Sequence, residues 1–259
     1  MPATIKTSPW TTWQPDDYLR DYYGGDVKPD EREAIRFQVD FLRSTGRTFA
    51  AAVEYGCGPT LGRAIAASSY VGSLDMADRL ERNLDKVRQW ASVDQDADDW
   101  SAFTRYVLQC EGVAWPNAGD MHAKERLTRT RMTDVVLTDA KQRDPLGRDR
   151  VGYYDLLITG FCVDCISTSK AVWRTCLVNV FTVLQGGGSF VVGALRRCRG
   201  YRVGDRWFPA CDIDRADLEA ALLRCGSDPA FLHIEERDLP AYHDQGYDGI
   251  LMASGRKRT

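Results

Sequence analysis

Short apolar runs alternate along this chain with segments that have the spacing of amphipathic helices. Consecutive parallel strands need a helical crossover between them, so this alternation indicates an α/β protein with a largely parallel sheet and helices on both of its faces. The expected strands are, in order, residues 48–55, 70–78, 134–139, 153–161 and 189–195. The expected helices are residues 30–44, the segment after the glycine turn at 56–58, and residues 79–90, 100–108, 123–132, 169–184 and 214–226.

The end of the chain departs from this alternation. Residues 231–239 and 246–257 both have strand patterns and no helix separates them, so the sheet should end in an antiparallel pair. Residues 201–208 alternate around a Gly-Asp turn, which predicts a β-hairpin. At 259 residues the chain is expected to form a single domain, with residues 1–46 as an N-terminal lid and residues 47–259 as the core.

Composition argues against several other classes of protein. The net charge of -3 and the isoelectric point near 5.7 do not suit a surface for nucleic acid or anionic membranes. No apolar run approaches the roughly 18 residues that cross a bilayer, and the N-terminus lacks the apolar stretch of a signal peptide, so we expect a cytoplasmic protein. The eight cysteines lie mostly in apolar stretches and are expected to be reduced. Cys162 and Cys165 have the spacing of a metal-binding pair, but no second pair or nearby histidine completes a site.

A glycine-rich turn, Gly56-Cys57-Gly58-Pro59-Thr60, lies between the first expected strand and the helix that follows it. In a doubly wound sheet this position binds a nucleotide-like ligand, because glycines let the ligand approach the backbone beside free helix N–H groups. Asp78 follows about 20 residues later at the end of the second strand, where a carboxylate can accept both ribose hydroxyls. Glu54 precedes the turn as a second acid. A dinucleotide dehydrogenase is the competing interpretation, but its motif needs glycine where Leu61 stands.

Further motifs follow in order along nearly the whole chain. They are Pro15-Asp-Asp-Tyr18-Leu-Arg-Asp-Tyr22-Tyr23, Gly56-Cys-Gly-Pro-Thr60, Asp78-Arg-Leu-Glu-Arg-Asn83, Thr138-Asp139, Phe161-Cys-Val-Asp164, Gly193-Ala-Leu195 and Tyr201-Arg-Val-Gly-Asp-Arg-Trp-Phe208. With these motifs the chain resembles the family of nicotinamide, phenylethanolamine and thioether methyltransferases. The resemblance implies a Rossmann-like class I fold with a seven-stranded, mostly parallel sheet, an antiparallel last strand and a helical N-terminal lid. It also implies S-adenosylmethionine as the cofactor.

The resemblance carries a set of cofactor-binding residues over to this chain by matching position. They are Tyr18 and Tyr23 over the cofactor, Gly56, Gly58 and Thr60 at its methionine end, Asp78 and Asn83 at the ribose, Asp139 and Ala140 at the adenine, and Gly160 on the reaction side. Two positions depart from the family. Arg79 stands where relatives have an aromatic residue after the ribose acid, and Gly62 stands where a relative has tyrosine.

The expected acceptor pocket departs further from the family. At the end of the fifth strand, where relatives that methylate amines carry acids, this chain has Gly193 followed by Arg196 and Arg197. An arginine pair suits a carboxylate or phosphate, so an acceptor with an anionic end is one interpretation, and arginines on a solvated hairpin are the other. Asp164 keeps an acid that lines the amine pocket in relatives. The expected catalytic residues are Asp164 and Tyr18, and the expected acceptor-binding residues are Tyr22, Phe161, Asp164, Arg196, Arg197 and Tyr201, with His243 and Asp244 as a weaker acid/base pair.

These observations predict an S-adenosylmethionine-dependent methyltransferase that acts on a small molecule, at the nitrogen of an amine or of a heteroaromatic ring. O-, S- or C-methylation of a natural-product intermediate is an alternative, and so is a cofactor-binding protein without catalysis. Catalysis would consist mainly of positioning and desolvating the nucleophile. We expect no metal, no nucleic-acid or membrane partner, and a monomer or weak homodimer.

Overall fold

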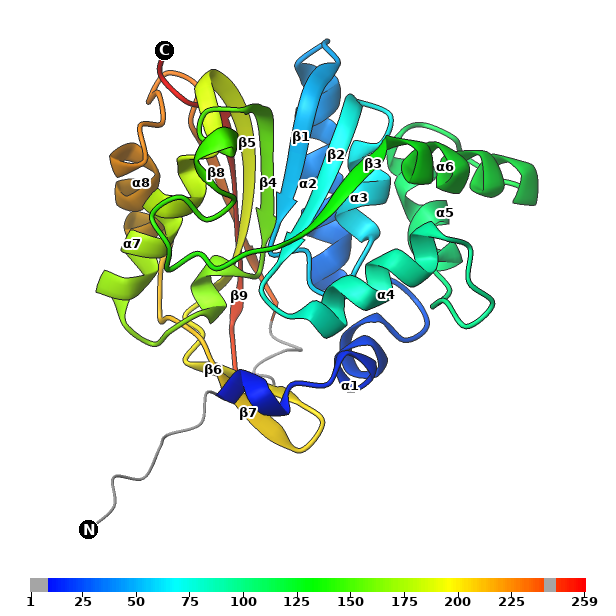
Figure 1. Cartoon of the computed structure of the whole chain (residues 1–259), viewed down its shortest axis with the longest axis horizontal. Helices are drawn as coiled ribbons and strands as arrows, with labels where there is room; N and C mark the ends of the chain where they lie inside the picture. Colours follow the sequence, from blue (N-terminus) through cyan, green and yellow to red (C-terminus); the bar gives the residue numbers. More distant parts are fainter. Residues whose placement is uncertain (1–8, 240–245) are drawn as a thin grey trace.

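A seven-stranded sheet runs through the centre of the molecule (Figure 1). The computed structural model describes residues 9–239 and 246–259. The strand order is β3-β2-β1-β4-β5-β9-β8, and β6 and β7 form a separate hairpin. The strands are β1 (Phe49–Tyr55), β2 (Val71–Asp78), β3 (Met132–Leu137), β4 (Tyr154–Gly160), β5 (Leu184–Arg196), β6 (Gly200–Val203), β7 (Arg206–Pro209), β8 (His233–Asp238) and β9 (Gly249–Arg256).

The directions of the strands confirm the expected topology. The strands β3, β2, β1, β4 and β5 are parallel to one another. Strand β9 is antiparallel to both of its neighbours, β5 and β8. The chain builds outward from β1 to β3 on one side and from β4 to β5 on the other. The carboxyl ends of β1 and β4 therefore flank the point where the strand order reverses, which is where doubly wound sheets bind their ligands.

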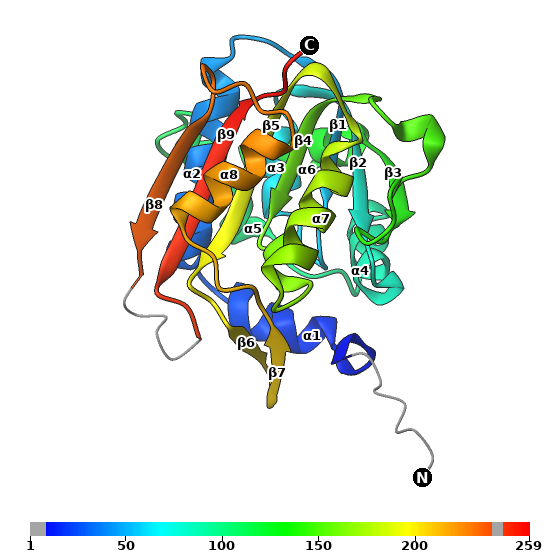
Figure 2. The same ribbon diagram turned by 90° about the vertical axis from the view of Figure 1, so that its left-hand side faces the viewer.

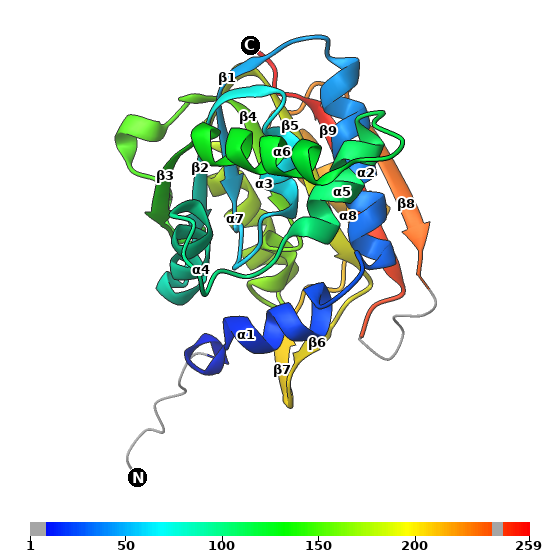
Figure 3. The same cartoon turned by 90° about the vertical axis from the view of Figure 1, so that its right-hand side faces the viewer.

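Helices cover both faces of the sheet. One face carries α7 and α8 (Figure 2), and the helices α2, α3, α5 and α6 lie over the other (Figure 3). The helices are α2 (Pro29–Ser44), α3 (Gly62–Ala67), α4 (Glu81–Ala91), α5 (Ser101–Cys110), α6 (Ala118–Arg131), α7 (Lys170–Phe181) and α8 (Arg215–Arg224), with the short 3₁₀ turns η3 (Arg148–Arg150) and η4 (Val163–Cys165).

The residues of β1 show why this strand lies in the middle of the sheet. Val53 and Tyr55 pack in the apolar cluster that contains Trp173 of α7, whereas Ala52 packs in the cluster that contains Ile35 of α2. Successive strand residues point to opposite faces, so a strand covered on both faces must be apolar at nearly every position. Residues 49–55 meet this requirement at every position except Glu54, near the carboxyl end of the strand.

Two elements are longer than their sequence patterns predicted. Helix α6 begins at Ala118 instead of 123, because Asn117 and Asp120 form a capping box at its start. Strand β5 begins at Leu184, inside the expected helix, and runs through the glycines 186–188. The register of β5 against β4 shifts in this stretch, so the glycines are accommodated as a bulge rather than as a turn before the strand.

The N-terminal segment crosses the edge of the sheet where the parallel strands end (Figure 1). It consists of η1 (Pro9–Thr12), α1 (Pro15–Tyr18) and the π-helical turn η2 (Leu19–Tyr23). Trp10 stacks on Phe208 of the β6–β7 hairpin with ring centres 5.3 Å apart, and Trp13 meets the same ring edge-on at 5.1 Å. The indole N–H of Trp13 donates to the side-chain oxygen of Asn83 at 3.0 Å. Aromatic packing thus joins the segment to the hairpin, and a hydrogen bond joins it to α4.

Within residues 9–239 and 246–259, no helix is both long enough and apolar enough to cross a membrane. The same part of the chain contains no group of three His, Cys, Asp or Glu side chains placed to hold a metal ion. The eight cysteines carry free thiols, and most of them are buried.

Candidate active site

The turn between β1 and α3 depends on two glycines with a left-handed backbone. Gly56 has a φ angle of 73° and Gly58 one of 60°, which residues with a Cβ rarely adopt. A Cβ on Gly56 would also lie 1.9 Å from Sγ of Cys162. Both glycines line a cavity, together with Cys57 and Thr60 of the same turn. A ligand can therefore approach the backbone here.

Asp78 ends β2 beside this turn, and three donors hold its carboxylate. Oδ2 accepts a hydrogen bond from the N–H of Gly58 at 2.9 Å. Oδ1 accepts from the N–H of Leu80 at 2.8 Å and from the side-chain amide of Asn83 at 3.0 Å. Burial raises the pKa of Asp78, and these hydrogen bonds oppose that rise. The carboxylate is thus fixed in the cavity wall, where it can accept hydrogen bonds from a ribose.

The cavity at the turn has a volume of about 110 Å³. It brings together most of the residues predicted to bind a cofactor, although they come from distant parts of the sequence. Those that line it are Tyr18, Tyr23, Gly56, Gly58, Thr60, Asp78, Asn83 and Gly160. The N-terminal segment forms one wall, since Trp10 and Trp13 also line the cavity. We call it the first cavity.

Asp139 and Ala140 are not among the residues that line the first cavity. Oδ2 of Asp139 lies 3.8 Å from Nε of Arg79, which does line it. Ala140 is buried, and its carbonyl accepts a hydrogen bond from the side chain of Asn179 on α7. Asp139 therefore borders the cavity through Arg79, whereas Ala140 belongs to the core around α7.

Arg63 lines the first cavity as well, although no sequence motif indicated it. The guanidinium forms an ion pair with Glu31 at 3.2 Å and lies over the ring of Phe161, 4.9 Å from its centre. Gly160 makes room for it, because a Cβ there would lie 2.2 Å from Nε of Arg63. One signal in the sequence could have indicated that Arg63 has a special role. It lies among apolar residues in a short helix, and a charged side chain that is buried there needs partners.

Two carboxylates surround Arg63. Glu31 accepts a hydrogen bond from the hydroxyl of Tyr23 at 2.5 Å, which connects α2 to the N-terminal segment. Glu54 is buried, and within the described part of the chain its Oε2 atom has no hydrogen-bond partner. Burial raises the pKa of Glu54 to about 8, because desolvation outweighs the attraction of Arg63. Glu54 is not among the residues that line the cavity, so it acts on a ligand there only through its neighbours.

A second, smaller cavity of about 30 Å³ adjoins the first. The two share Tyr18, Tyr23, Phe161, Cys165 and Tyr201, and the remaining residues that line the second cavity are Tyr22, Asp30, Glu31, Leu195 and Tyr247. Aromatic rings thus form most of its wall, and its charged groups are carboxylates. Three of the residues predicted to bind the acceptor, Tyr22, Phe161 and Tyr201, lie here together.

Phe161 lies at the junction of the two cavities with an unusual backbone conformation. Its φ angle is 54°, which is uncommon for a residue with a bulky side chain. Its N–H donates to the carbonyl of Gly193 at 2.9 Å. Such strain persists only where surrounding contacts impose it, so the position of this ring is strongly determined.

Asp164, the first candidate for catalysis, is buried and is not among the residues that line either cavity. Its Oδ2 atom accepts hydrogen bonds from the N–H of Leu195 at 2.8 Å and from the thiol of Cys165 at 3.7 Å. Burial raises the pKa of Asp164 to about 6. Both donors belong to residues of the second cavity, so Asp164 supports the wall of that cavity from behind.

Asp30 and Glu31 are acids that line the second cavity without having been predicted. Asp30 differs from Glu31 because it has no arginine beside it in the described residues. It lies in the first turn of α2, and its Oδ2 atom accepts a hydrogen bond from the hydroxyl of Tyr247 at 3.0 Å. The two residues are 217 positions apart, so no local pattern could have connected them. His243 and Asp244, the weaker acid/base candidates, lie outside the described residues.

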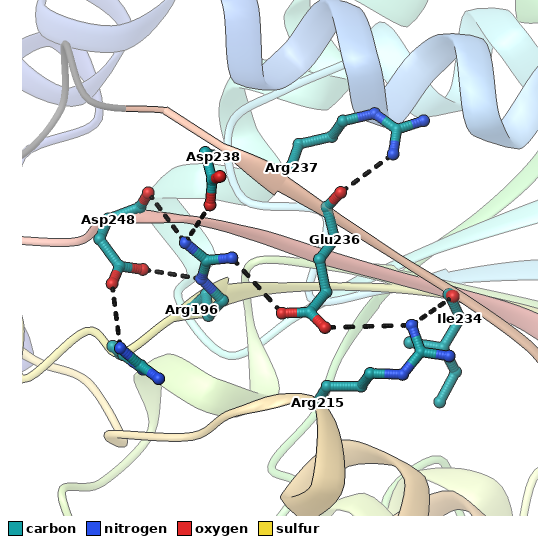
Figure 4. Close-up of polar contacts among 8 residues, drawn as sticks. Arg196, Arg215, Ile234, Glu236, Arg237, Asp238 and Asp248 are labelled. Carbon is teal, nitrogen blue, oxygen red and sulfur yellow. Dashed lines mark hydrogen bonds and ion pairs between the residues drawn. The ribbon is translucent and has the colours of Figure 1, made fainter.

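Arg196 lies in a network of carboxylates at the end of β5 (Figure 4). Its guanidinium contacts Asp238 at 2.5 Å, Asp248 at 2.8 Å and Glu236 at 3.4 Å. The side chain of Arg197 is 67% exposed and lies 3.9 Å from Asp248. Neither arginine lines the first or the second cavity. The structure therefore does not bring the expected anion-binding pair together with the other acceptor residues, because acids around β8 and β9 engage Arg196.

Comparison with known proteins agrees with this geometry. The model of the NNMT/PNMT/TEMT family matches residues 3–258. Indolethylamine N-methyltransferase of Oryctolagus cuniculus is 26% identical over 219 residues, which cover 83% of this chain and 82% of the relative. Phenylethanolamine N-methyltransferase of Sus scrofa is 28% identical over 269 residues, which cover 95% and 89%. The crystal structure of magnesium protoporphyrin IX methyltransferase from Synechocystis PCC 6803 shares the fold with a TM-score of 0.59 at 14% identity, covering 99% of this chain and 100% of that one.

The match extends over nearly the whole chain, and the motifs that carry it meet in space. The glycine turn, the acid at the end of β2 and the tyrosines of the N-terminal segment all line the first cavity. The chain therefore belongs to the NNMT/PNMT/TEMT family and is an S-adenosylmethionine-dependent methyltransferase.

Proposed function

We propose that this enzyme transfers a methyl group to the nitrogen of a small aromatic amine that is positively charged in neutral solution. The second cavity is the observation that carries this proposal, because its wall is aromatic and its charged groups are carboxylates. Ring faces and carboxylates attract an ammonium group and disfavour an anion. The names of the two curated relatives support the same class, since indolethylamine and phenylethanolamine are both aromatic amines.

The residues of the first cavity fit S-adenosylmethionine, because Gly56 has no room for a side chain, Gly58 has a left-handed backbone and a fixed carboxylate stands beside them. Bound there, the cofactor supplies a methyl group attached to a positively charged sulfur. In this proposal the residues that hold it are Gly56, Gly58 and Thr60 at the methionine end, Asp78 and Asn83 at the ribose, Asp139 through Arg79 at the adenine, Tyr18 and Tyr23 from the N-terminal segment, and Gly160 on the reaction side.

Arg63 adds a cation to the wall of the first cavity. A guanidinium carries five N–H donors, so Arg63 can bind the carboxylate of the cofactor while it keeps its ion pair with Glu31. This arrangement would replace the tyrosine that a relative carries at the position of Gly62. The cofactor would then touch the same residue that packs on Phe161 at the junction of the cavities.

Transfer requires the amine lone pair to point at the methyl carbon. The ammonium would first lose a proton to a carboxylate, which would pass it to solvent. The free amine would then attack, so that the N–C bond would form while the C–S bond of the cofactor would break and its electron pair would stay on sulfur. Phe161 and Tyr201 line both cavities and would orient the amine at their junction. The aromatic walls exclude water, which favours the amine as the nucleophile. Asp164 would contribute by fixing Leu195 and Cys165 rather than by touching the acceptor.

An acceptor with an anionic end is not favoured by this geometry. Arg196 is held by three carboxylates, and neither it nor Arg197 lines the second cavity. A carboxylate placed in the second cavity would instead face Asp30 and Glu31 in a partly desolvated space, where like charges repel more than in water.

Turnover of matched acceptors tests the proposal. Indolethylamine and indole-3-acetate share one ring system and carry opposite charges, and nicotinamide is a neutral aromatic. With each acceptor, formation of S-adenosylhomocysteine and the mass of the methylated product are measured against a control without enzyme. We expect efficient N-methylation of indolethylamine and none of indole-3-acetate. Preferred methylation of indole-3-acetate, or a product methylated on oxygen or carbon, would contradict the proposal.

A further inference from the structure

We propose that Asp30 is the anchor for the positively charged nitrogen of the acceptor in the second cavity. The inference rests on the proposed function, and it concerns a residue that no sequence motif indicated. Asp30 is only 6% exposed, and it lines the second cavity. Its Oδ2 atom accepts from Tyr247, whereas its Oδ1 atom is buried and has no hydrogen-bond partner within residues 9–239 and 246–259. A buried carboxylate oxygen without a donor is costly unless a ligand supplies one.

The other two carboxylates near the second cavity are committed to the protein. Oε1 of Glu31 accepts from the hydroxyl of Tyr23 at 2.5 Å. Oε2 has no hydrogen-bond partner in the described residues, as with Oδ1 of Asp30, but it lies 3.2 Å from the guanidinium of Arg63, which compensates the charge of Glu31. Asp164 accepts from the N–H of Leu195 and does not line the cavity. In the described part of the chain Asp30 has no cationic partner, so its charge is the one that a bound ammonium would compensate.

The surroundings of Asp30 suit an ammonium rather than a metal or a neutral donor. The rings of Tyr18 and Tyr22 lie 5.1 Å apart in the same cavity wall, and Tyr201 completes that wall. An ammonium that leaves water is stabilised by a carboxylate on one side and by ring faces on the others. A cation there would also favour the ionised form of Asp30, whose pKa burial raises to about 6 in the protein alone.

The position of Asp30 explains how the chain can bind amines although its fifth strand lacks the family's acids. The end of β5 has Gly193 and Arg196, and Arg196 is held by acids outside the cavity. Asp30 approaches from α2, and Tyr247, which precedes β9, orients its carboxylate. Asp30 thus places an acid in the second cavity from α2 instead of from the sheet.

The substitution Asp30→Asn tests the assignment, because it removes the charge and keeps the shape of the side chain. With indolethylamine as the acceptor, we expect the Michaelis constant to rise about 10- to 100-fold, since a charge-assisted hydrogen bond is lost. The Kd for indolethylamine in the presence of S-adenosylhomocysteine, measured by calorimetry, should rise by the same factor. The Kd for S-adenosylhomocysteine and the melting temperature should stay close to their original values. Asp26→Asn is the matched control, because Asp26 is exposed four residues before.

Two further measurements separate a binding role from a structural one. Asp30→Glu should recover part of the affinity for indolethylamine, and Asp30→Asn should weaken the binding of indolethylamine more than that of neutral nicotinamide. Unchanged constants for indolethylamine in Asp30→Asn would overturn the assignment and leave the proposed function intact. Amine binding that depends on Asp30 without any N-methylation would support the assignment and overturn the proposed function. An original protein that does not bind indolethylamine at all would overturn both.

Discussion

Glu54 is a buried carboxylate at the end of β1, and its protonation connects the stability of the protein to pH. Its Oε2 atom has no hydrogen-bond partner in the described residues, and burial raises its pKa from an ordinary 4.5 to about 8. Between these two values the unfolded chain loses the proton while the folded chain keeps it. The contribution of Glu54 to stability is therefore fully present below pH 4.5 and is lost as the pH rises toward 8.

Glu54→Gln should remove this loss, because glutamine resembles the protonated acid at every pH. We expect the variant to become more stable than the original protein as the pH rises from about 5 to about 8.5, by several kcal/mol at most, since one pKa unit corresponds to about 1.4 kcal/mol. Urea unfolding at both pH values measures the difference. Glu219→Gln, an exposed position on α8, is the control and should show no such trend. A stability difference for Glu54→Gln that does not change with pH would contradict the interpretation.

At the scale of single residues, the sequence predicted what depends on nearby residues. The proximity of Gly56, Gly58 and Asp78 could be predicted because a turn and a strand end place them locally, and the hydrogen bond between Gly58 and Asp78 spans only 20 positions. The position of Asp30 in a cavity wall could not be predicted, because its partner, Tyr247, is 217 positions away. The position of Arg63 depends on packing against α2 and on the ring that follows β4, which no local pattern indicates.

At the scale of elements, Arg196 joins the end of β5 to the antiparallel pair β8 and β9 (Figure 4). Its side chain is 15% exposed and contacts Glu236, Asp238 and Asp248. Arg196→Ala would leave three acids close together without their cation. We therefore expect the free energy of unfolding to fall by about 2 kcal/mol, which lies between the losses on breaking an exposed and a buried ion pair. Denaturant unfolding at neutral pH measures this loss.

Arg197→Ala is the matched control for this prediction. Its guanidinium is largely exposed and lies 3.9 Å from Asp248, so the substitution should change the free energy of unfolding by less than about 0.5 kcal/mol. Neither substitution should change the Michaelis constant for indolethylamine appreciably. Undiminished stability of Arg196→Ala, together with a higher Michaelis constant for indole-3-acetate, would restore the anionic acceptor that the sequence suggested.

The elements themselves could be predicted well, and the exceptions have physical causes. The order of strands and helices follows from hydrophobic periodicity, which every buried element must satisfy. The start of β5 at Leu184 could not be read from this pattern, because a bulge opposite β4 accommodates glycines that resemble a turn. The orientation of the Arg196 side chain could not be predicted from the sequence either. Its partners lie in β8 or next to β9, about 40 to 50 positions later in the chain.

At the scale of the whole molecule, the N-terminal segment closes the first cavity, and we expect it to open for the ligand. Trp10, Trp13, Tyr18 and Tyr23 all line that cavity. Hydrogen bonds from Trp13 to Asn83 and from Tyr23 to Glu31, and an ion pair of 2.6 Å between Asp16 and Lys86, hold the segment closed. Opening would break these contacts while the sheet stays folded, as in lids over active sites.

Limited trypsin digestion should show this opening, because Arg20 is exposed within the segment. Cleavage at Arg20 requires the segment to leave the cavity, and a bound cofactor contacts the segment only when it is closed. S-adenosylhomocysteine at 100 times its Kd stabilises the closed state by up to about 2.7 kcal/mol, so cleavage should slow up to about 100-fold, while NAD should have no effect. Lys86→Met should accelerate cleavage without ligand and retain the protection by S-adenosylhomocysteine, whereas Lys141→Met, at an exposed lysine, should cleave like the original protein. Equal cleavage rates with and without S-adenosylhomocysteine, under conditions where calorimetry shows saturation, would mean that the ligand enters without displacing the segment.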